Sequence, residues 1–207
     1  MIRFKYSLRA SDSSHFLFLS AVFLLLSPFN ARAGDATVTL QLPPDFLAKA
    51  CSAPPWKDVT VLWQGVKDAR SDPEIGRQTK KEGKDPTLIL SEPPLDLILD
   101  RALRDLFSSC GIRLLTEGNA EKGLSVEIDE FYAGVEKRFL TGKSVAKSRL
   151  KFLVKRNGAL TNTVEVGYEL ESRTVRQKGI KQLEKTLNEL LWRTLEQIPQ
   201  LSSLREL

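Results

Sequence analysis

Four charged side chains that could do chemistry occupy alternate positions: Asp68, Arg70, Asp72 and Glu74. They follow a β-branched, apolar run ending at Val66, which is typical of a buried strand. A carboxylate pair can hydrolyse glycosides or bind Ca²⁺. The spacing matches no EF-type calcium loop, and Asp is common at strand ends because it hydrogen-bonds to turn backbone. We therefore favour a structural role, in which Asp68 or Arg70 organises the next loop, over a carboxylate-based polysaccharide hydrolase.

A second candidate site is the polar segment from Asp68 to Pro86, which contains two glycines and two prolines and predicts a long loop. Its basic residues could contact anionic lipid headgroups, although Glu82 and Asp85 lie among them and also fit an ordinary solvated loop. The candidate partner-binding residues of this region are Asp68, Arg70, Arg77, Lys80, Lys81 and Lys84.

The scarcity of histidine excludes several kinds of active site. His15 is the only histidine in the chain, and it lies within a predicted export signal. The rest of the chain therefore cannot form a Ser-His-Asp triad, a Cys-His pair, a histidine general base or a histidine-containing zinc site. We predict no metal and no cofactor, and the sequence favours a protein that is not an enzyme.

Two cysteines, Cys51 and Cys110, could form a structural bond. In an oxidising compartment an even pair is more often a disulfide than two free thiols. Such a bond would close a loop of about 60 residues and stabilise the fold by roughly 4 kcal/mol in the chain-entropy model. Two separate buried thiols are the alternative.

The start of the chain has the three parts of a secretory signal peptide. Three basic residues lie among the first nine, an apolar run extends from Phe16 to Leu26, and Ala31 and Ala33 are small residues at the positions that a signal peptidase recognises. The apolar run is much shorter than the roughly 20 residues needed to cross a bilayer. We therefore predict cleavage after Ala33, rather than an uncleaved anchor, and a periplasmic protein.

Removing the signal changes the charge balance. Residues 1–33 contain four basic residues and one acidic residue, so 27 basic and 25 acidic residues remain and the net charge falls from +5 to +2. A nearly balanced chain in a compartment with little nucleic acid is not expected to bind nucleic acid. The expected partners are an envelope protein or a lipid, with peripheral membrane contact.

The remaining chain predicts a single α+β domain over 57–198, preceded by a short strand and a Pro-rich linker over 34–56 and followed by a flexible tail over 199–207. Two amphipathic helices are expected, one beginning at Pro94 and the other covering 178–198. With the alternating runs, they predict an antiparallel or mixed β-sheet with two amphipathic helices packed on one face.

Two alternating runs, 144–155 and 163–174, predict a hairpin with one basic and one acidic outer strand face. A two-residue type I′ turn at Asn157-Gly158 would set outward side chains opposite inward ones. We therefore predict a three-residue loop over 157–159 with a bulge. In that register the facing pairs are Lys151 with Glu165 and Lys147 with Glu169.

Short motifs in this domain resemble those of the YajG-type family of bacterial envelope lipoproteins. The first long strand ends Val66-Lys67-Asp68-Ala69-Arg70, Ile75-Gly76 follows, and a helix ends just before Gly111. The resemblance covers roughly residues 57–198 and implies an α+β envelope protein whose biochemical role the family leaves open. This sequence departs from the family because no cysteine lies near the predicted cleavage point, so we do not expect lipid attachment.

The function favoured by the sequence is that of an exported, non-catalytic cell-envelope module. It would bind a protein or lipid partner through the predicted 68–86 loop and the edge of the sheet. A structural subunit that self-associates through Trp192 and the closing helix is the second hypothesis, and the polysaccharide hydrolase is the third.

Overall fold

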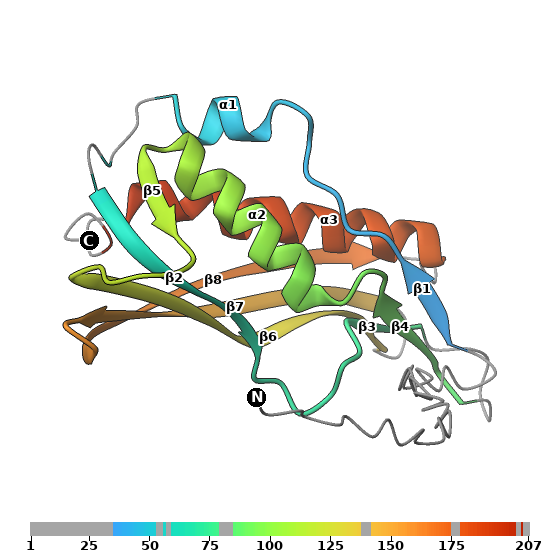
Figure 1. Cartoon of the computed structure of the whole chain (residues 1–207). Helices are drawn as coiled ribbons and strands as arrows, with labels where there is room; N and C mark the ends of the chain where they lie inside the picture. Colours follow the sequence, from blue (N-terminus) through green and yellow to red (C-terminus); the bar gives the residue numbers. More distant parts are fainter. Residues whose placement is uncertain are drawn as a thin grey trace, which may run out of the picture. The chain divides into compact units, whose positions relative to one another are not determined.

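The computed structural model describes residues 35–52, 56, 59–78, 85–137, 142–174, 179–201 and 204. The predicted signal peptide lies outside these residues. The described part of the chain forms a mixed sheet of eight strands together with three α-helices (Figure 1). The predicted α+β class and mixed sheet are confirmed.

Three α-helices and eight strands follow one another along the described part of the chain. The helices are α1 (Phe46–Ala50), α2 (Leu95–Ser109) and α3 (Ile180–Gln197), and a 3₁₀ turn, η1 (Ile198–Gln200), extends the last one. The strands are β1 (Ala36–Val38), β2 (Val59–Asp68), β3 (Gly76–Gln78), β4 (Thr87–Ser91), β5 (Ile112–Leu115), β6 (Lys122–Lys137), β7 (Gly142–Arg156) and β8 (Ala159–Thr174).

The long strand β6 organises the sheet. On one edge it pairs with β7 in antiparallel fashion, and β7 pairs in turn with β8. On its other edge it pairs with β2 and then, further along, with β3, both in parallel. β5 pairs with β2, β4 pairs with β3, and β1 pairs with β4.

All three helices lie on the same side of the sheet (Figure 1). The apolar stripe of α2, which includes Leu95, Leu99, Leu103 and Leu106, is fully buried. This helix contacts β2 and β5, whereas α3 contacts β6, β7 and β8. The predicted packing of two amphipathic helices on one face is therefore confirmed, and their apolar periodicity is the cause.

Two strands were not predicted. β3 lies inside the segment 68–86, which the sequence analysis expected to be one long loop, and β4 follows it directly. β3 is only the three residues Gly-Arg-Gln and has no hydrophobic alternation, so its pairing partners rather than its own sequence define it as a strand. The prediction of a continuous loop over 68–86 was wrong for this reason.

The β7–β8 hairpin has the predicted register but a different turn. Lys151 faces Glu165 and Lys147 faces Glu169, as expected. The turn is nonetheless the two-residue Asn157-Gly158 type, in which both residues have a positive φ, 51° and 82°. The bulge lies further on, at Thr161, whose hydroxyl donates to the Val154 carbonyl at 3.1 Å.

The packed region extends past the boundaries expected for the domain. Trp56 is 1% exposed, and its indole N–H donates to the carbonyl of Leu204 at 2.9 Å. Leu204 and Pro199 are buried as well, although the sequence assigned both to a flexible tail. The residues before β2 and after α3 therefore contribute to the same core.

Candidate functional site

β2 and β3 share one edge of β6 and leave a gap between them. The amide of Ala69 donates to the carbonyl of Ile128 at 3.1 Å, where the pairing with β2 stops. The amide of Ala133 donates to the carbonyl of Ile75 at 2.9 Å, where the pairing with β3 begins. Between these two points the chain leaves β6 and makes a short loop.

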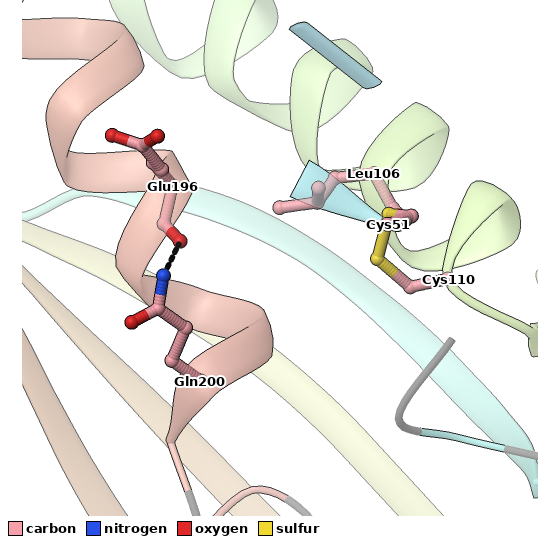
Figure 2. The surroundings of a disulfide bond; sticks show 5 residues. All are labelled: Cys51, Leu106, Cys110, Glu196 and Gln200. Atoms are coloured by element: carbon pink, nitrogen blue, oxygen red, sulfur yellow. Dashed lines mark hydrogen bonds between the residues drawn. A yellow bond between two sulfur atoms is a disulfide. The ribbon is translucent and has the colours of Figure 1, made fainter. Parts of the chain in front are cut away.

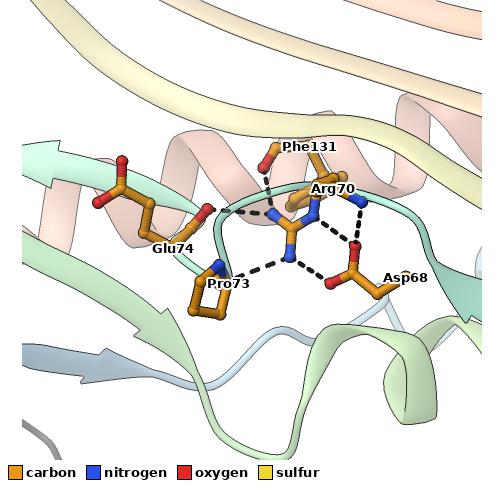
Figure 3. Close-up of polar contacts among 5 residues, drawn as sticks. All are labelled: Asp68, Arg70, Pro73, Glu74 and Phe131. Atoms are coloured by element: carbon orange, nitrogen blue, oxygen red, sulfur yellow. Dashed lines mark hydrogen bonds and ion pairs between the residues drawn. The ribbon is translucent and has the colours of Figure 1, made fainter.

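The side chain of Arg70 fills this gap (Figure 3). Its guanidinium donates to the carbonyl oxygens of Phe131 at 2.9 Å and of Glu74 at 3.1 Å. It therefore supplies the hydrogen bond to the β6 backbone at the point where neither β2 nor β3 pairs with it. Its Nε and Nη2 donate to the two carboxylate oxygens of Asp68, at 2.9 and 2.7 Å. The side chain is only 8% exposed. We call the residues Asp68 to Glu74 with this guanidinium the arginine latch.

The Asp68 carboxyl is held ionised by the latch. Burial raises its pKa, but the hydrogen bonds from the Arg70 side chain and backbone and the nearby guanidinium charge lower it by more. The net result is a pKa below the ordinary value of 3.8. A carboxyl of this kind is a poor general acid because it releases its proton far below neutral pH.

The carboxylates of the latch do not converge. Figure 3 shows the Glu74 side chain pointing away from Asp68. Its carboxylate accepts instead from Nε of Arg77 at 2.5 Å, and the Glu74 side chain is 9% exposed. Asp72 is exposed and accepts a hydrogen bond from the neighbouring Ser71. This geometry removes the basis of the polysaccharide hydrolase hypothesis, which requires two carboxylates that face a common cleft.

The predicted partner-binding residues separate into three groups. Asp68 and Arg70 are bonded to each other inside the latch, where they serve the fold. Arg77 is half exposed on β3 beside Glu74. Lys80, Lys81 and Lys84 lie outside the described residues.

Tyr132 joins this region and was not anticipated from the sequence. Burial raises its pKa, and the charge of Arg77 opposes this shift while Glu74 adds to it. Its ring covers Gly134, because a Cβ built at that glycine would lie 2.8 Å from the phenol oxygen. An outward-facing Tyr two residues from a Gly on the same strand is the signal that could have indicated this packing.

Gly76 allows β3 to approach β6. A Cβ at this position would lie 2.6 Å from the carbonyl oxygen of Ala133, a backbone atom that cannot move aside. The Ile-Gly pair that supported the family resemblance therefore has a steric cause. The Asp-x-Arg of the same resemblance forms the latch.

The predicted disulfide between Cys51 and Cys110 is confirmed. It joins the end of α1 to the end of α2 beside Leu106 (Figure 2), and Cys110 is fully buried. The bond therefore fixes the short α1 against the core.

A small cleft lies between α1 and α3. Pro43, Phe46 and Trp192 supply its apolar surface, and its volume is about 160 Å³. That is less than the roughly 300–1,000 Å³ of pockets that hold drug-sized ligands. Trp192 is half-buried here, and the guanidinium of Arg193 lies 4.0 Å from the centre of its ring. The cleft is therefore small for a site that binds a drug-sized ligand.

Ordered rows of charge cover the face of the sheet opposite the helices. On β7, Lys147 contacts Glu169 of β8 at 3.2 Å, while Lys151 contacts Asp129 of β6 at 2.9 Å. A looser pair at 3.5 Å joins Arg149 to β6. The outer face therefore alternates from acidic on β6 to basic on β7 and acidic on β8.

β8 forms an open edge of the sheet. Within the described residues it pairs with β7 alone, although it is sixteen residues long. The amide of Tyr168 points toward β7, where it donates to the hydroxyl of Ser148 at 3.2 Å. Backbone groups alternate in direction along an antiparallel strand. The amides and carbonyls that point away from β7 therefore belong to Thr163, Glu165, Gly167 and Glu169, all of which are exposed.

Two further features concern metal binding and membrane spanning. The described residues contain no group of three or more His, Cys, Asp or Glu side chains placed to hold a metal ion. None of the helices in this part of the chain is long and apolar enough to cross a membrane.

Comparison with known proteins identifies a family and a fold. The sequence profile of a family described as uncharacterized lipoprotein matches residues 57–207. A crystal structure from Xanthomonas campestris, of a protein in the family DUF330, superposes with a TM-score of 0.55 at 10% identity, covering 82% of this chain and 94% of that one. No curated protein sequence matches.

Two further solved structures are more distant. A minor lipoprotein from Acinetobacter baumannii has a TM-score of 0.36 at 11% identity and covers 55% of this chain and 84% of its own. A lipoprotein from Neisseria meningitidis has a TM-score of 0.32 at 10% identity, with 69% and 99% covered. Of these three structures, the one from Xanthomonas has a TM-score above 0.5, and at 10% identity it supports a shared fold alone.

Proposed function

This chain belongs to the uncharacterized lipoprotein family, and we propose that it is an exported accessory protein of the cell envelope that binds a protein partner at the open edge of β8. In this proposal the signal peptide is cleaved after Ala33 and the remaining chain works in the periplasm. The YajG-type resemblance supports the same compartment. The basic residues Lys80, Lys81 and Lys84 stay candidates for a separate contact with lipid.

The open edge is the observation that carries this proposal. An edge strand presents a row of unpaired amides and carbonyls to which an extended segment can add by main-chain hydrogen bonds. β8 offers such a row from Thr163 to Glu169, where its register with β7 is regular because the shift at Thr161 lies earlier in the strand. Its inward side chains Val164 and Val166 are buried, so the edge is held in place by the core.

Binding rather than catalysis is favoured by how the polar groups are used. The guanidinium of Arg70 and the carboxylate of Asp68 are bonded to each other and to the backbone. Glu74 is engaged by Arg77. These are the side chains that a carboxylate mechanism would need, and they stabilise the loop instead.

Site-specific photocrosslinking in the cell envelope tests this proposal. A photoreactive phenylalanine analogue is placed at Thr163 on the edge, and at Leu97 on α2, which is 60% exposed, as a control position. We expect a discrete adduct from Thr163 and none from Leu97. Absence of an adduct at the edge, or the same adduct at both positions, would overturn the proposal.

Two variants of Glu165 make the test specific for strand addition. Glu165→Pro removes an amide that points away from β7, so it blocks an incoming strand while leaving the β7–β8 pairing intact. Glu165→Ala keeps the amide and removes the charge. We expect the Thr163 adduct to disappear with the proline variant and to persist with the alanine variant, with circular dichroism confirming that both variants are folded. An adduct that survives in Glu165→Pro would mean that the edge is not used.

A further inference from the structure

We infer that the segment bound at the β8 edge is a basic strand, with Lys or Arg at every second residue and apolar residues between them. This inference rests on the proposed function, because it names the chemistry of the partner at the same edge. It concerns the side chains of the incoming strand, whereas the proposal above concerns its backbone.

The charge order of the sheet carries the inference. The outer face is acidic on β6, basic on β7 and acidic on β8, with contacts of 2.9 Å between Lys151 and Asp129 and 3.2 Å between Lys147 and Glu169. Opposite charges on neighbouring strands stabilise pairing, and like charges directly opposite weaken it. The next strand beyond β8 would lie beside Glu165 and Glu169. An incoming strand with basic residues on its outer face would continue the alternation of acidic and basic strands.

The inner face requires apolar residues at the intervening positions. Val164 and Val166 point to the side of the sheet that the helices cover, and they are 8% and 3% exposed. Tyr168 and Leu170 continue this row and are half-buried against the core. Because side chains alternate along a strand, the incoming segment would place its apolar residues beside this row and its basic residues beside the glutamates.

A second copy of this chain is a poorer occupant of the same edge. Residues 159–172 contain Glu165, Glu169 and Glu171 but no Lys or Arg. Two β8 edges paired about Gly167 would set Glu165 of one copy opposite Glu169 of the other, twice. Such like-charge pairs are unfavourable. Charge complementarity therefore selects a basic partner over self-association.

The chain itself supplies a suitable probe. A peptide with the sequence of residues 144–155 has the basic and apolar alternation of β7, which already pairs with β8 on its other side. The matched control is the same peptide with glutamate in place of Lys147, Arg149 and Lys151. Hydrogen exchange of the β8 amides and the dissociation constant are measured for both peptides with the full chain.

We expect the basic peptide to slow exchange at Thr163, Glu165, Gly167 and Glu169 by about tenfold and to bind at least about tenfold more tightly than its acidic counterpart. Exchange at Val164 and Val166 should stay unchanged, because those amides already face β7. The variant Glu165→Lys should reverse or abolish the preference between the two peptides. Changed exchange at Val164 and Val166 would instead indicate that the peptide displaces β7, and would overturn the inference.

The other outcomes separate the two proposals. Equal binding of both peptides with protection of the edge would overturn the basic partner and leave strand addition standing. Absence of protection with either peptide would overturn both the basic partner and strand addition. Protection of the edge that rises with protein concentration, without any peptide, would replace the basic partner by a second copy of this chain.

Discussion

The gap beside β6 and the edge of β8 are two places where the same sheet leaves a strand without a neighbour. At β6 the unpaired backbone is short, and the buried guanidinium of Arg70 occupies it with bonds to Phe131 and Glu74. At β8 the unpaired backbone is long, and the side chains along it are exposed glutamates and small residues. One opening is closed from within the chain, and within the described residues the other is not.

The difference shows which opening is part of the fold and which is available to a partner. A buried backbone carbonyl without a donor is costly, so a gap inside the sheet must be satisfied by the chain itself. An edge exposed to water does not have that requirement, because water satisfies its amides. Acidic side chains at alternate positions keep such an edge soluble and discourage pairing with its own copies.

Removing the Arg70 guanidinium from the latch should cause the largest loss in the free energy of unfolding. Arg70→Ala leaves the Phe131 and Glu74 carbonyls and the Asp68 carboxylate without their donor, and we expect the free energy of unfolding to fall by about 3 kcal/mol. Arg70→Lys should restore only part of this loss, since an ammonium lacks the planar fork that donates to the Asp68 carboxylate and to backbone carbonyls at once. Urea denaturation measures both.

The matched control for the latch lies on the outer face. Arg149→Ala removes an exposed arginine whose contact with Glu130 is 3.5 Å long, and it should change stability by about 0.5 kcal/mol or less. If Arg70→Ala were as mild as Arg149→Ala, the gap beside β6 would not need its guanidinium. The contrast between the two openings would then be lost.

Crowding β3 against β6 should have a smaller effect. In Gly76→Ala the new Cβ would meet the Ala133 carbonyl at 2.6 Å, and we expect a loss of about 2 kcal/mol in the free energy of unfolding. Gly123→Ala, on β6 itself, brings the new Cβ no closer than 3.6 Å to any neighbour and should stay within about 0.5 kcal/mol of the parent chain. Equal stability of the two variants would contradict the close approach of β3.

Long periodic patterns made much of the fold predictable. The apolar stripe of α2 extends over four turns and is clear from the sequence. Pro94 marks the start of this helix, and Gly111, with a φ of 98°, follows its last residues. The register of β7 with β8 followed from the need to keep apolar side chains on one face. The disulfide followed from the presence of only two cysteines in a chain whose sequence predicts export.

The latch and β3 could not be predicted in the same way, because they depend on distant backbone. Arg70 bonds to a carbonyl 61 positions away, and that acceptor is available only because β2 stops pairing at Asp68. The turn at Asn157-Gly158 was rejected for a related reason. The prediction assumed an unbroken ladder from the turn onward, whereas the bulge at Thr161 reconciles a type I′ turn with the required register.

The smallest predicted effect is the dependence of the latch on pH. The pKa of Asp68 lies below its ordinary value of 3.8, because the hydrogen bonds and charge of Arg70 outweigh the opposing effect of burial. A depressed pKa in the folded state contributes stability above the ordinary value and loses it as the pH falls through the lowered one. The stability difference between the parent chain and Asp68→Asn should therefore shrink as the pH falls below about 5, and it should keep shrinking until the pH is below the lowered pKa.

The variant isolates Asp68, since every other carboxyl titrates in both proteins. Asp68→Asn also keeps an oxygen that can accept from the Arg70 backbone and side chain, so the fold of the loop is retained. In an Arg70→Ala background, the stability difference caused by Asp68→Asn should lose most of its pH dependence, because the partner that lowers the pKa of Asp68 is gone. A stability difference that stays constant with pH in the parent background would show that the Asp68–Arg70 bond does not depend on the carboxylate charge. The latch would then be held by the backbone carbonyls to which Arg70 donates.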